Sequence, residues 1–134
     1  MNNYQVLEHT ADLRIAAWGK NEAELFQNMA LGLQETMLGR SLAIIKPSVS
    51  RKVEVEGEKT EWLLIDFLNE IIFLSETYNE IYSHCQVKIE NNKLEAILKG
   101  SRAVFDLEVK AATFHDFEFK KENGFLKAVV VFDI

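Results

Sequence analysis

This sequence contains little cysteine, proline or glycine, and it has no apolar run long enough to cross a membrane. Its 134 residues include one cysteine, one proline and six glycines. The single cysteine, Cys85, cannot form an intramolecular disulfide, and no Pro-rich or Ser/Gly-rich stretch marks a linker between domains. The apolar stretch WLLIDFLNEIIFL is interrupted by Asp66, Asn69 and Glu70, whereas a membrane-spanning helix needs about 20 apolar residues. We therefore expect a single globular domain, residues 1–134, without a membrane-spanning helix.

The chain also lacks a secretion signal and several common catalytic and metal-binding motifs. Its start, MNNYQVLEHT, has no charged segment followed by an apolar core, which favours a cytoplasmic protein. With one cysteine and three histidines there is neither a CxxC pair nor an HExxH helix, so zinc is not expected. No glycine-rich phosphate loop occurs, and neither Ser-His-Asp nor Cys-His catalysis has a local signature. Cys85 falls on the apolar face of its predicted strand, where a thiol is usually inert.

Acidic residues outnumber basic residues by 21 to 15, which gives a formal net charge of −6. A protein that holds nucleic acid by itself usually carries a Lys/Arg patch, because phosphate neutralisation supplies most of the affinity. The densest basic spots here, residues 50–52 and 120–121, are short. The charge balance therefore favours a protein partner or a cation over direct binding of nucleic acid.

The first part of the chain predicts a strand followed by a helix. Residues 13–17 alternate between the two faces of a half-buried strand. Residues 21–38 then place apolar side chains at helical spacing. Asn21 and Glu24 resemble a capping box at the start of this helix, and Gly39 is a plausible stop.

A second strand and a second helix follow. Alternation near residues 49–55 predicts the strand. In residues 62–74 apolar side chains cover so much of the helix circumference that this helix must be largely buried, across a sheet. Asp66, Asn69 and Glu70 share one face of it, which we interpret as the solvated face rather than a functional one.

The rest of the chain has the period of two that is typical of strands. Asn91-Asn92 predicts a hairpin turn, and Gly100 breaks the strand that follows. Asn123-Gly124 predicts a second hairpin, between TFHDFEFKK and FLKAVVVFDI. The order of elements predicts an α+β domain in which two helices pack on a mostly antiparallel sheet.

Two places in the sequence combine carboxylates with predicted strand ends. His9-Thr10-Ala11-Asp12 lies between two strand-like runs, where Thr and Asp are also good turn residues. In VVVFDI, Asp133 continues a valine face, and a carboxylate there is costly to bury without a partner. The carboxylate of Ile134 is adjacent, so two oxygen-donor groups could be fixed at one strand end. The alternative is a frayed end in solvent, and the strand pattern alone leaves both open.

The segment EVKAATFHDF places Lys110 and His115 among small and aromatic residues. His115 shares a face with Phe117 and Phe119 in a regular strand. That spacing favours a half-buried, hydrogen-bonded histidine in the core.

Taken together, five motifs in order along the chain resemble the archease family. They are HTAD (9–12), ELF (24–26), LLxxxLNE (63–70), VKAxTxH (109–115) and the terminal FDI (132–134). The match runs from end to end, and HTAD combined with VKAxTxH and a C-terminal Asp-Ile is more specific than any one motif. The chain departs from the family pattern at Ala112, where a valine is usual, and in the short segment from Gly100 to Val109. Neither departure touches the acidic positions.

The resemblance implies a small accessory protein rather than an enzyme, forming a single archease-like domain. Archeases promote guanylylation and multiple turnover of an RtcB-type RNA ligase, which acts in tRNA splicing and processing or in RNA repair. The ligase would be the partner, and RNA would be contacted only through it. Family members bind a divalent cation through acidic groups that correspond to Asp12 and Asp133, with the carboxylate of Ile134 as a plausible third donor. Such hard oxygen donors suit Ca²⁺, Mg²⁺ or Mn²⁺.

The same resemblance suggests which residues support that cation site. His9 and Thr10 would orient Asp12, while Lys110 and His115 would lie nearby. Two other functions compete with the accessory role. One is a metal-dependent hydrolase that uses the same acidic cluster, for which no base or nucleophile is identifiable. The other is a general chaperone or nucleic-acid modifier, and the net charge argues against independent RNA binding.

Overall fold

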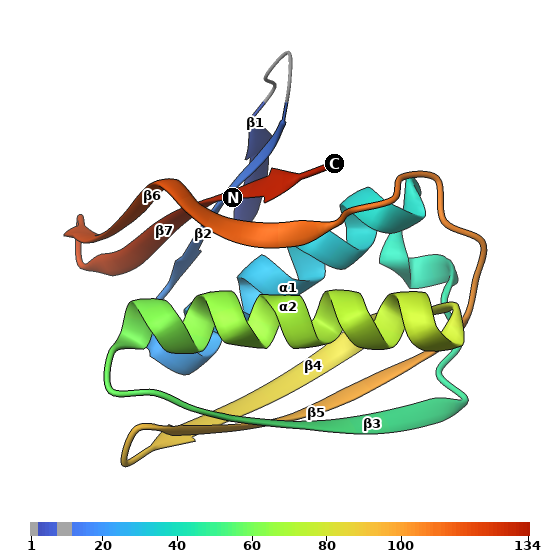
Figure 1. Cartoon of the computed structure of the whole chain (residues 1–134), viewed down its shortest axis with the longest axis horizontal. Coiled ribbons are helices and arrows are strands. Elements are labelled where there is room, and N and C mark those ends of the chain that lie inside the picture. The colour runs from blue at the N-terminus through green and yellow to red at the C-terminus, as the bar shows by residue number, and fades with distance from the viewer. Residues whose placement is uncertain (1–2, 8–11) are drawn as a thin grey trace.

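The computed structural model describes residues 3–7 and 12–134, which form two α-helices, one short 3₁₀ helix and seven strands (Figure 1). In chain order these elements are β1 (Tyr4–Leu7), β2 (Leu13–Gly19), α1 (Glu22–Leu38), η1 (Leu42–Ile44), β3 (Val49–Glu56), α2 (Thr60–Tyr78), β4 (Glu80–Glu90), β5 (Lys93–Arg102), β6 (Ala111–Glu122) and β7 (Phe125–Asp133). The strands pair antiparallel in two sheets, with the orders β1-β2-β7-β6 and β3-β5-β4. The predicted α+β class is confirmed, and the strands divide into two sheets where we expected one.

Both helices lie between the two sheets (Figure 1). Helix α1 contacts β2 of one sheet and β4 of the other, and α2 likewise contacts β6 and β3. The rings of Phe26 and Phe67 stack between the helices, with their centroids 6.1 Å apart. Because α2 is covered by two sheets and by α1, apolar side chains occupy most of its circumference. Although α2 is strongly apolar, no helix in the described part of the chain is suited in length and hydropathy to crossing a membrane.

The ends of α1 follow from local sequence. The side chain of Asn21 accepts a hydrogen bond from the backbone N–H of Glu24 at 2.9 Å. The carboxylate of Glu24 accepts from the N–H of Lys20 at 3.3 Å, so only one half of the predicted reciprocal capping box forms. Gly39 ends the helix in the left-handed conformation, with φ of 77°, as predicted.

Both predicted hairpin turns are present, but Gly100 does not end a strand. Asn91 and Asn92, and likewise Asn123 and Gly124, have positive φ values, as the tight turns between twisted strands require. Gly100 instead lies inside β5, opposite an irregularity in β4, and a Cβ atom there would overlap the carbonyl group of Ile81. The glycine is needed for close strand approach rather than for termination.

Amide side chains from the helices cover two strand edges. Asn69 on α2 accepts from the N–H of Ala112 at 2.8 Å and donates to the Ala112 carbonyl at 3.2 Å. On α1, Gln34 accepts from the N–H of Tyr82 at 2.7 Å. Our assignment of Asn69 to a solvated face was therefore wrong, whereas Asp66 and Glu70 are exposed as expected. At Ala112 of β6 and Tyr82 of β4, these amides supply the hydrogen-bond partners that a further strand would otherwise supply.

One ionised side chain is buried at the start of β4. Glu80 is only 3% exposed, and both of its oxygens accept hydrogen bonds from Arg51, each at 2.9 Å. The hydroxyl of Tyr82 also donates to Glu80, at 2.8 Å. These bonds, with that from Arg51 the strongest, hold the pKa of Glu80 below its ordinary value despite its burial. The ion pair joins β3 to β4 across the intervening strand β5.

Candidate functional site

The two predicted carboxylates lie at the same end of neighbouring strands. Strands β2 and β7 pair antiparallel, and their last pair at this end is Leu13 with Phe132. Asp12 and Asp133 are the next residues beyond that pair, so our expectation that these strands are neighbours is confirmed. His9 and Thr10, which we predicted beside Asp12, lie outside the described residues.

The end of β7 is held in the sheet. The pairing of β6 with β7 reaches Asp133, and the N–H of Lys110 donates to the Asp133 carbonyl at 2.8 Å. The alternative of a frayed strand end is therefore wrong for Asp133. Val130 and Phe132 face the core, so strand alternation turns the side chains of Val131 and Asp133 to the outer face of the sheet. The side chain of Lys110 is exposed beside the same strand end.

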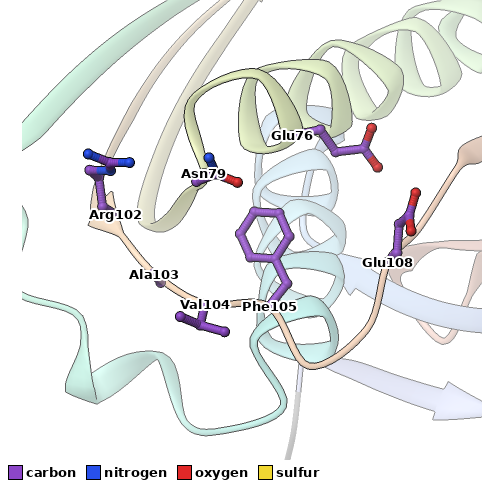
Figure 2. Close-up of a pocket in the computed structure, with 7 residues that line it drawn as sticks. All are labelled: Glu76, Asn79, Arg102, Ala103, Val104, Phe105 and Glu108. Carbon is purple, nitrogen blue, oxygen red and sulfur yellow. The ribbon is translucent and has the colours of Figure 1, made fainter.

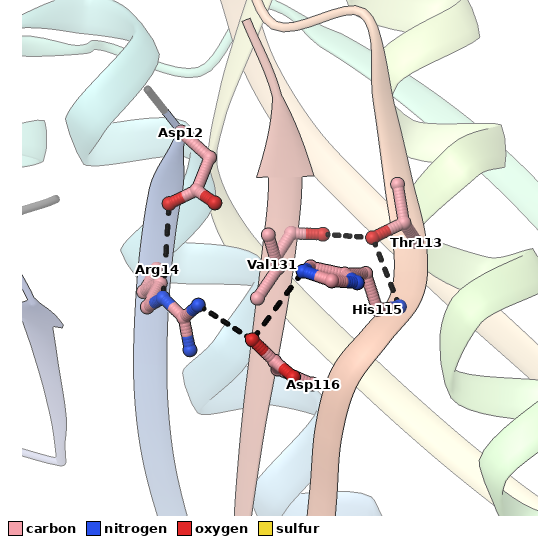
Figure 3. A network of polar contacts seen from close by, with 6 residues as sticks. All are labelled: Asp12, Arg14, Thr113, His115, Asp116 and Val131. Atoms are coloured by element: carbon pink, nitrogen blue, oxygen red, sulfur yellow. Dashed lines mark hydrogen bonds and ion pairs between the residues drawn. The ribbon is translucent and has the colours of Figure 1, made fainter. Parts of the chain in front are cut away.

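Arg14 connects this strand end to β6 (Figure 3). Its Nε atom lies 3.7 Å from Asp12 Oδ1, and its Nη2 atom donates to Asp116 Oδ2 at 2.8 Å. The hydrogen bond that Arg14 donates to Asp116 raises the pKa of Arg14 still further, so the guanidinium is permanently charged. His115 Nε2 lies 3.4 Å from the same Asp116 oxygen. Asp12 therefore lies beside the positive charge of Arg14, and the hydrogen bond to Asp116 on β6 fixes the position of that charge.

A bulge in β6 places His115 and Asp116 on this surface. Thr113 pairs with Val131 and Glu118 with Val129, so residues 114–117 lie opposite Val130 alone. The hydroxyl of Thr113 donates to the Val131 carbonyl at 2.9 Å and accepts from the N–H of His115 at 3.3 Å (Figure 3). Asp116 has a positive φ of 49°. Residues in such a bulge leave the regular alternation of the strand.

The bulge also overturns our interpretation of His115. The histidine side chain is 70% exposed rather than half-buried in the core. Counting alternate residues to Phe117 and Phe119 assumed an unbroken strand, and the extra residues of the bulge change which face each side chain takes. His115 is brought to the surface that Arg14 and Asp116 occupy.

Arg14 and Asp116 belong to this site but were not predicted from the sequence. Arg14 follows Asp12 by two residues, so strand alternation could have placed both side chains on one face. Asp116 carried no such signal, because its position depends on the bulge. Cys85, in contrast, is as expected: burial raises the pKa of its thiol to about 12, which keeps it protonated at neutral pH.

The oxygen donors at this strand end fit a hard divalent cation in their chemistry. The side chains of Asp12 and Asp133 offer only oxygen ligands, which Ca²⁺, Mg²⁺ and Mn²⁺ prefer. Within residues 3–7 and 12–134 there is no group of three or more His, Cys, Asp and Glu side chains that could hold a metal ion. Side chains of the described residues therefore contribute at most two carboxylates to a cation at this strand end. Any further ligands would have to be groups other than these side chains.

The model of the Archease protein family matches residues 4–134. The chain belongs to the archease family. Among its relatives is Protein archease of Methanothermobacter thermautotrophicus, which is 32% identical and aligned over 100% of both chains. Protein archease of Archaeoglobus fulgidus is 34% identical, with 98% of each chain covered. The resemblance drawn from the five sequence motifs is thus confirmed.

Two solved structures share the archease-like fold of this chain. A solution structure of a protein from Methanobacterium thermoautotrophicum matches with a TM-score of 0.76, 29% identity and 100% coverage of both chains. A crystal structure of an archease from Thermotoga maritima, described as a possible chaperone, matches with a TM-score of 0.68 and 27% identity. That match covers 96% of this chain and 94% of the other.

Proposed function

We propose that this archease-family protein is an accessory protein that promotes guanylylation and multiple turnover of an RtcB-type RNA ligase in tRNA splicing or RNA repair. In this proposal Asp12, Asp133 and the carboxylate of Ile134 hold a divalent cation, Ca²⁺, Mg²⁺ or Mn²⁺. The observation that carries it is the pairing of β2 with β7, because Asp12 and Asp133 are both the next residues beyond the last pair of that ladder. When bound, the cation would supply Lewis-acid chemistry toward phosphate oxygens.

The neighbouring residues would position these ligands. Arg14, fixed by Asp116 at 2.8 Å, lies beside Asp12 and restricts where the Asp12 carboxylate can point. The N–H of Lys110 fixes the backbone of Asp133. We propose that His9 and Thr10 orient Asp12, and that the exposed His115 contacts the partner or its substrate.

The net charge of the protein suits this role. A ligase that gathers RNA phosphates, GTP phosphates and metal ions needs electropositive surroundings, and a protein of charge −6 is attracted to them. An accessory protein can shift its partner toward guanylylation only by binding one state of the partner more tightly than another. RNA would be contacted through the ligase rather than by this chain alone.

The test is a ligation time course with ligase in excess over this protein and RNA in excess over both, with guanylylated ligase measured separately. We expect substoichiometric protein to raise both the guanylylation rate and the number of turnovers. Asp12→Ala or Asp133→Ala should abolish the gain, whereas Asp66→Ala, an exposed aspartate on α2, should not. Equal guanylylation with and without the protein would contradict the proposal. Hydrolysis of GTP or RNA by the protein alone would point to a metal-dependent hydrolase instead.

A further inference from the structure

A pocket of about 790 Å³ lies beside the segment that joins β5 to β6 (Figure 2). Its principal side chains come from the end of α2, the end of β5 and the joining segment. They are Glu76, Asn79, Arg102, Val104, Phe105 and Glu108. None of these residues belongs to the carboxylate site, so the pocket is a separate feature of the surface.

The walls of this pocket are anchored to the fold. The N–H of Ala103 donates to the carbonyl of Asn79 at 3.0 Å. Farther along, the N–H groups of Asp106 and Leu107 both donate to the carbonyl of Met37, at 2.9 and 3.1 Å. Phe105 lies between these anchors and packs against the core. The joining segment is thus held at its start and at its middle, and the pocket does not need a ligand to acquire its shape.

The charged groups of the pocket are separated. Glu76 and Glu108 lie on one side of the Phe105 ring, and Arg102 lies on the opposite side, beyond Asn79 (Figure 2). A Lys or Arg side chain resting on Phe105 would meet an aromatic ring and two carboxylates together. The same carboxylates would repel the phosphates of RNA.

Large exposed apolar side chains accompany these charges. Val104 in the joining segment is 83% exposed, which is the highest value among the large apolar residues of the described chain. Phe73 is 61% exposed and precedes Glu76 by three residues, so the two are neighbours on the surface of α2. Exposed apolar side chains close to charged ones, such as Phe73 beside Glu76, are typical of surfaces that contact another protein.

The joining segment that lines the pocket runs on to the strand end that carries Asp133. Glu108 lies two residues before Lys110, whose N–H donates to the Asp133 carbonyl at 2.8 Å. In Figure 1 the segment that joins β5 to β6 leads to the start of β6, where Ala111 pairs with Asp133 of β7. A single partner could therefore contact the pocket and the carboxylates of Asp12 and Asp133 together.

We propose that this pocket is a docking site for a protein partner and receives one of its Lys or Arg side chains. The aliphatic part of that side chain lies on Phe105, and its charge pairs with Glu76 and Glu108. The inference rests on the proposed function for the identity of the partner, which is the RtcB-type ligase. The pocket then supplies affinity and orientation, while the carboxylate strand end acts on guanylylation.

The experiment compares the affinity of the full chain for a cognate RtcB-type ligase between two charge-matched variants. The first, Glu76→Lys with Glu108→Lys, reverses the charge of the pocket. The control, Glu58→Lys with Glu90→Lys, makes the same change at exposed glutamates near the opposite end of α2. We expect the pocket variant to weaken ligase binding by about tenfold or more, and the control by about twofold or less.

A third variant, Val104→Ser, tests the apolar part of the pocket without altering charge. Because Val104 is so exposed, the variant should fold normally and still bind the ligase several-fold more weakly. If the wild-type protein binds and stimulates the ligase while the pocket variants match the control, the docking inference is overturned and the proposed function stands. If the wild-type protein neither binds nor stimulates the ligase, both fail.

Discussion

Arg14 joins the HTAD motif to the segment that follows the VKAxTxH motif. It lies beside Asp12 of the HTAD motif at 3.7 Å and bonds Asp116, which follows the VKAxTxH motif, at 2.8 Å. A guanidinium can contact two carboxylates at once because its N–H donors point in several fixed directions. Side chains from β2 and β6 thereby meet across the intervening strand β7.

Asp12→Asn and Asp133→Asn should each lower the affinity for divalent cations by at least about tenfold, since each removes one charged oxygen ligand. The melting temperature should stay close to that of the wild type, because neither side chain belongs to the core. Isothermal titration calorimetry with Ca²⁺, Mg²⁺ and Mn²⁺ measures the affinity, and Asp66→Asn serves as the control. Unchanged affinity in Asp12→Asn would remove Asp12 from the proposed site.

Glu80→Gln should destabilise the protein at neutral pH by roughly 1–3 kcal/mol, because the bidentate bond with Arg51 is lost in a buried position. Arg51 lowers the pKa of Glu80 in the folded state. The stabilisation is therefore complete above the unfolded pKa of about 4.3 and is lost as pH falls through the lower folded value. Urea unfolding at several pH values measures the free energy of unfolding. The difference in that free energy between wild type and variant should become smaller in acid. A difference that is constant with pH would argue against this ion pair as its source.

Helix α2 positions the site through one amide side chain. Asn69 satisfies both the N–H and the carbonyl of Ala112, the second residue of β6. The preceding residue, Ala111, pairs with Asp133 of β7. The helix therefore fixes the start of the strand that lies beside the proposed cation ligands.

Asn69→Ala should loosen the start of β6, because the N–H and carbonyl of Ala112 would lose their partners. We expect a loss of about 1–2 kcal/mol in unfolding free energy and faster amide exchange at Ala112. Hydrogen exchange followed by NMR measures this effect residue by residue. Asp66→Ala, which truncates an exposed side chain of the same helix, should leave exchange in β6 unchanged. Equal exchange in both variants would show that other contacts hold this strand.

The net charge of the protein bears on which partners it can bind. With a formal net charge of −6 and carboxylates at one strand end, we expect it to repel free nucleic acid and to attract a positively charged protein. Such attraction mainly raises the rate of association and is screened by salt. The electrostatic contribution to the association rate can therefore be separated, by varying the salt concentration, from the contribution of contacts made after docking.

RNA binding by the protein alone should be undetectable at both about 50 mM and about 200 mM salt, since phosphate contacts would need a basic surface. Association with the ligase should slow over the same range. Fluorescence anisotropy with labelled RNA and stopped-flow mixing with labelled ligase measure the two quantities. RNA binding that is tight at low salt and falls steeply as salt rises would favour the nucleic-acid modifier instead.

Local sequence alone determined the elements of this fold. Asn21 and Gly39 bound the first helix, and the turns at Asn91-Asn92 and Asn123-Gly124 join strand pairs as predicted. These signals succeed because capping and tight turns depend on the conformation of only a few consecutive residues. The five motifs likewise sufficed to identify the family.

Only the tertiary structure decided how those elements combine. It divided the strands into two sheets, turned Asn69 toward Ala112, and placed His115 and Asp116 in a bulge. The contact between Arg14 and Asp116 joins residues 102 positions apart. Strand order, register and bulges depend on pairing between distant segments, and a shift of one residue reverses the face that each side chain takes. Alternation within one strand therefore cannot reveal which side chains meet at the site.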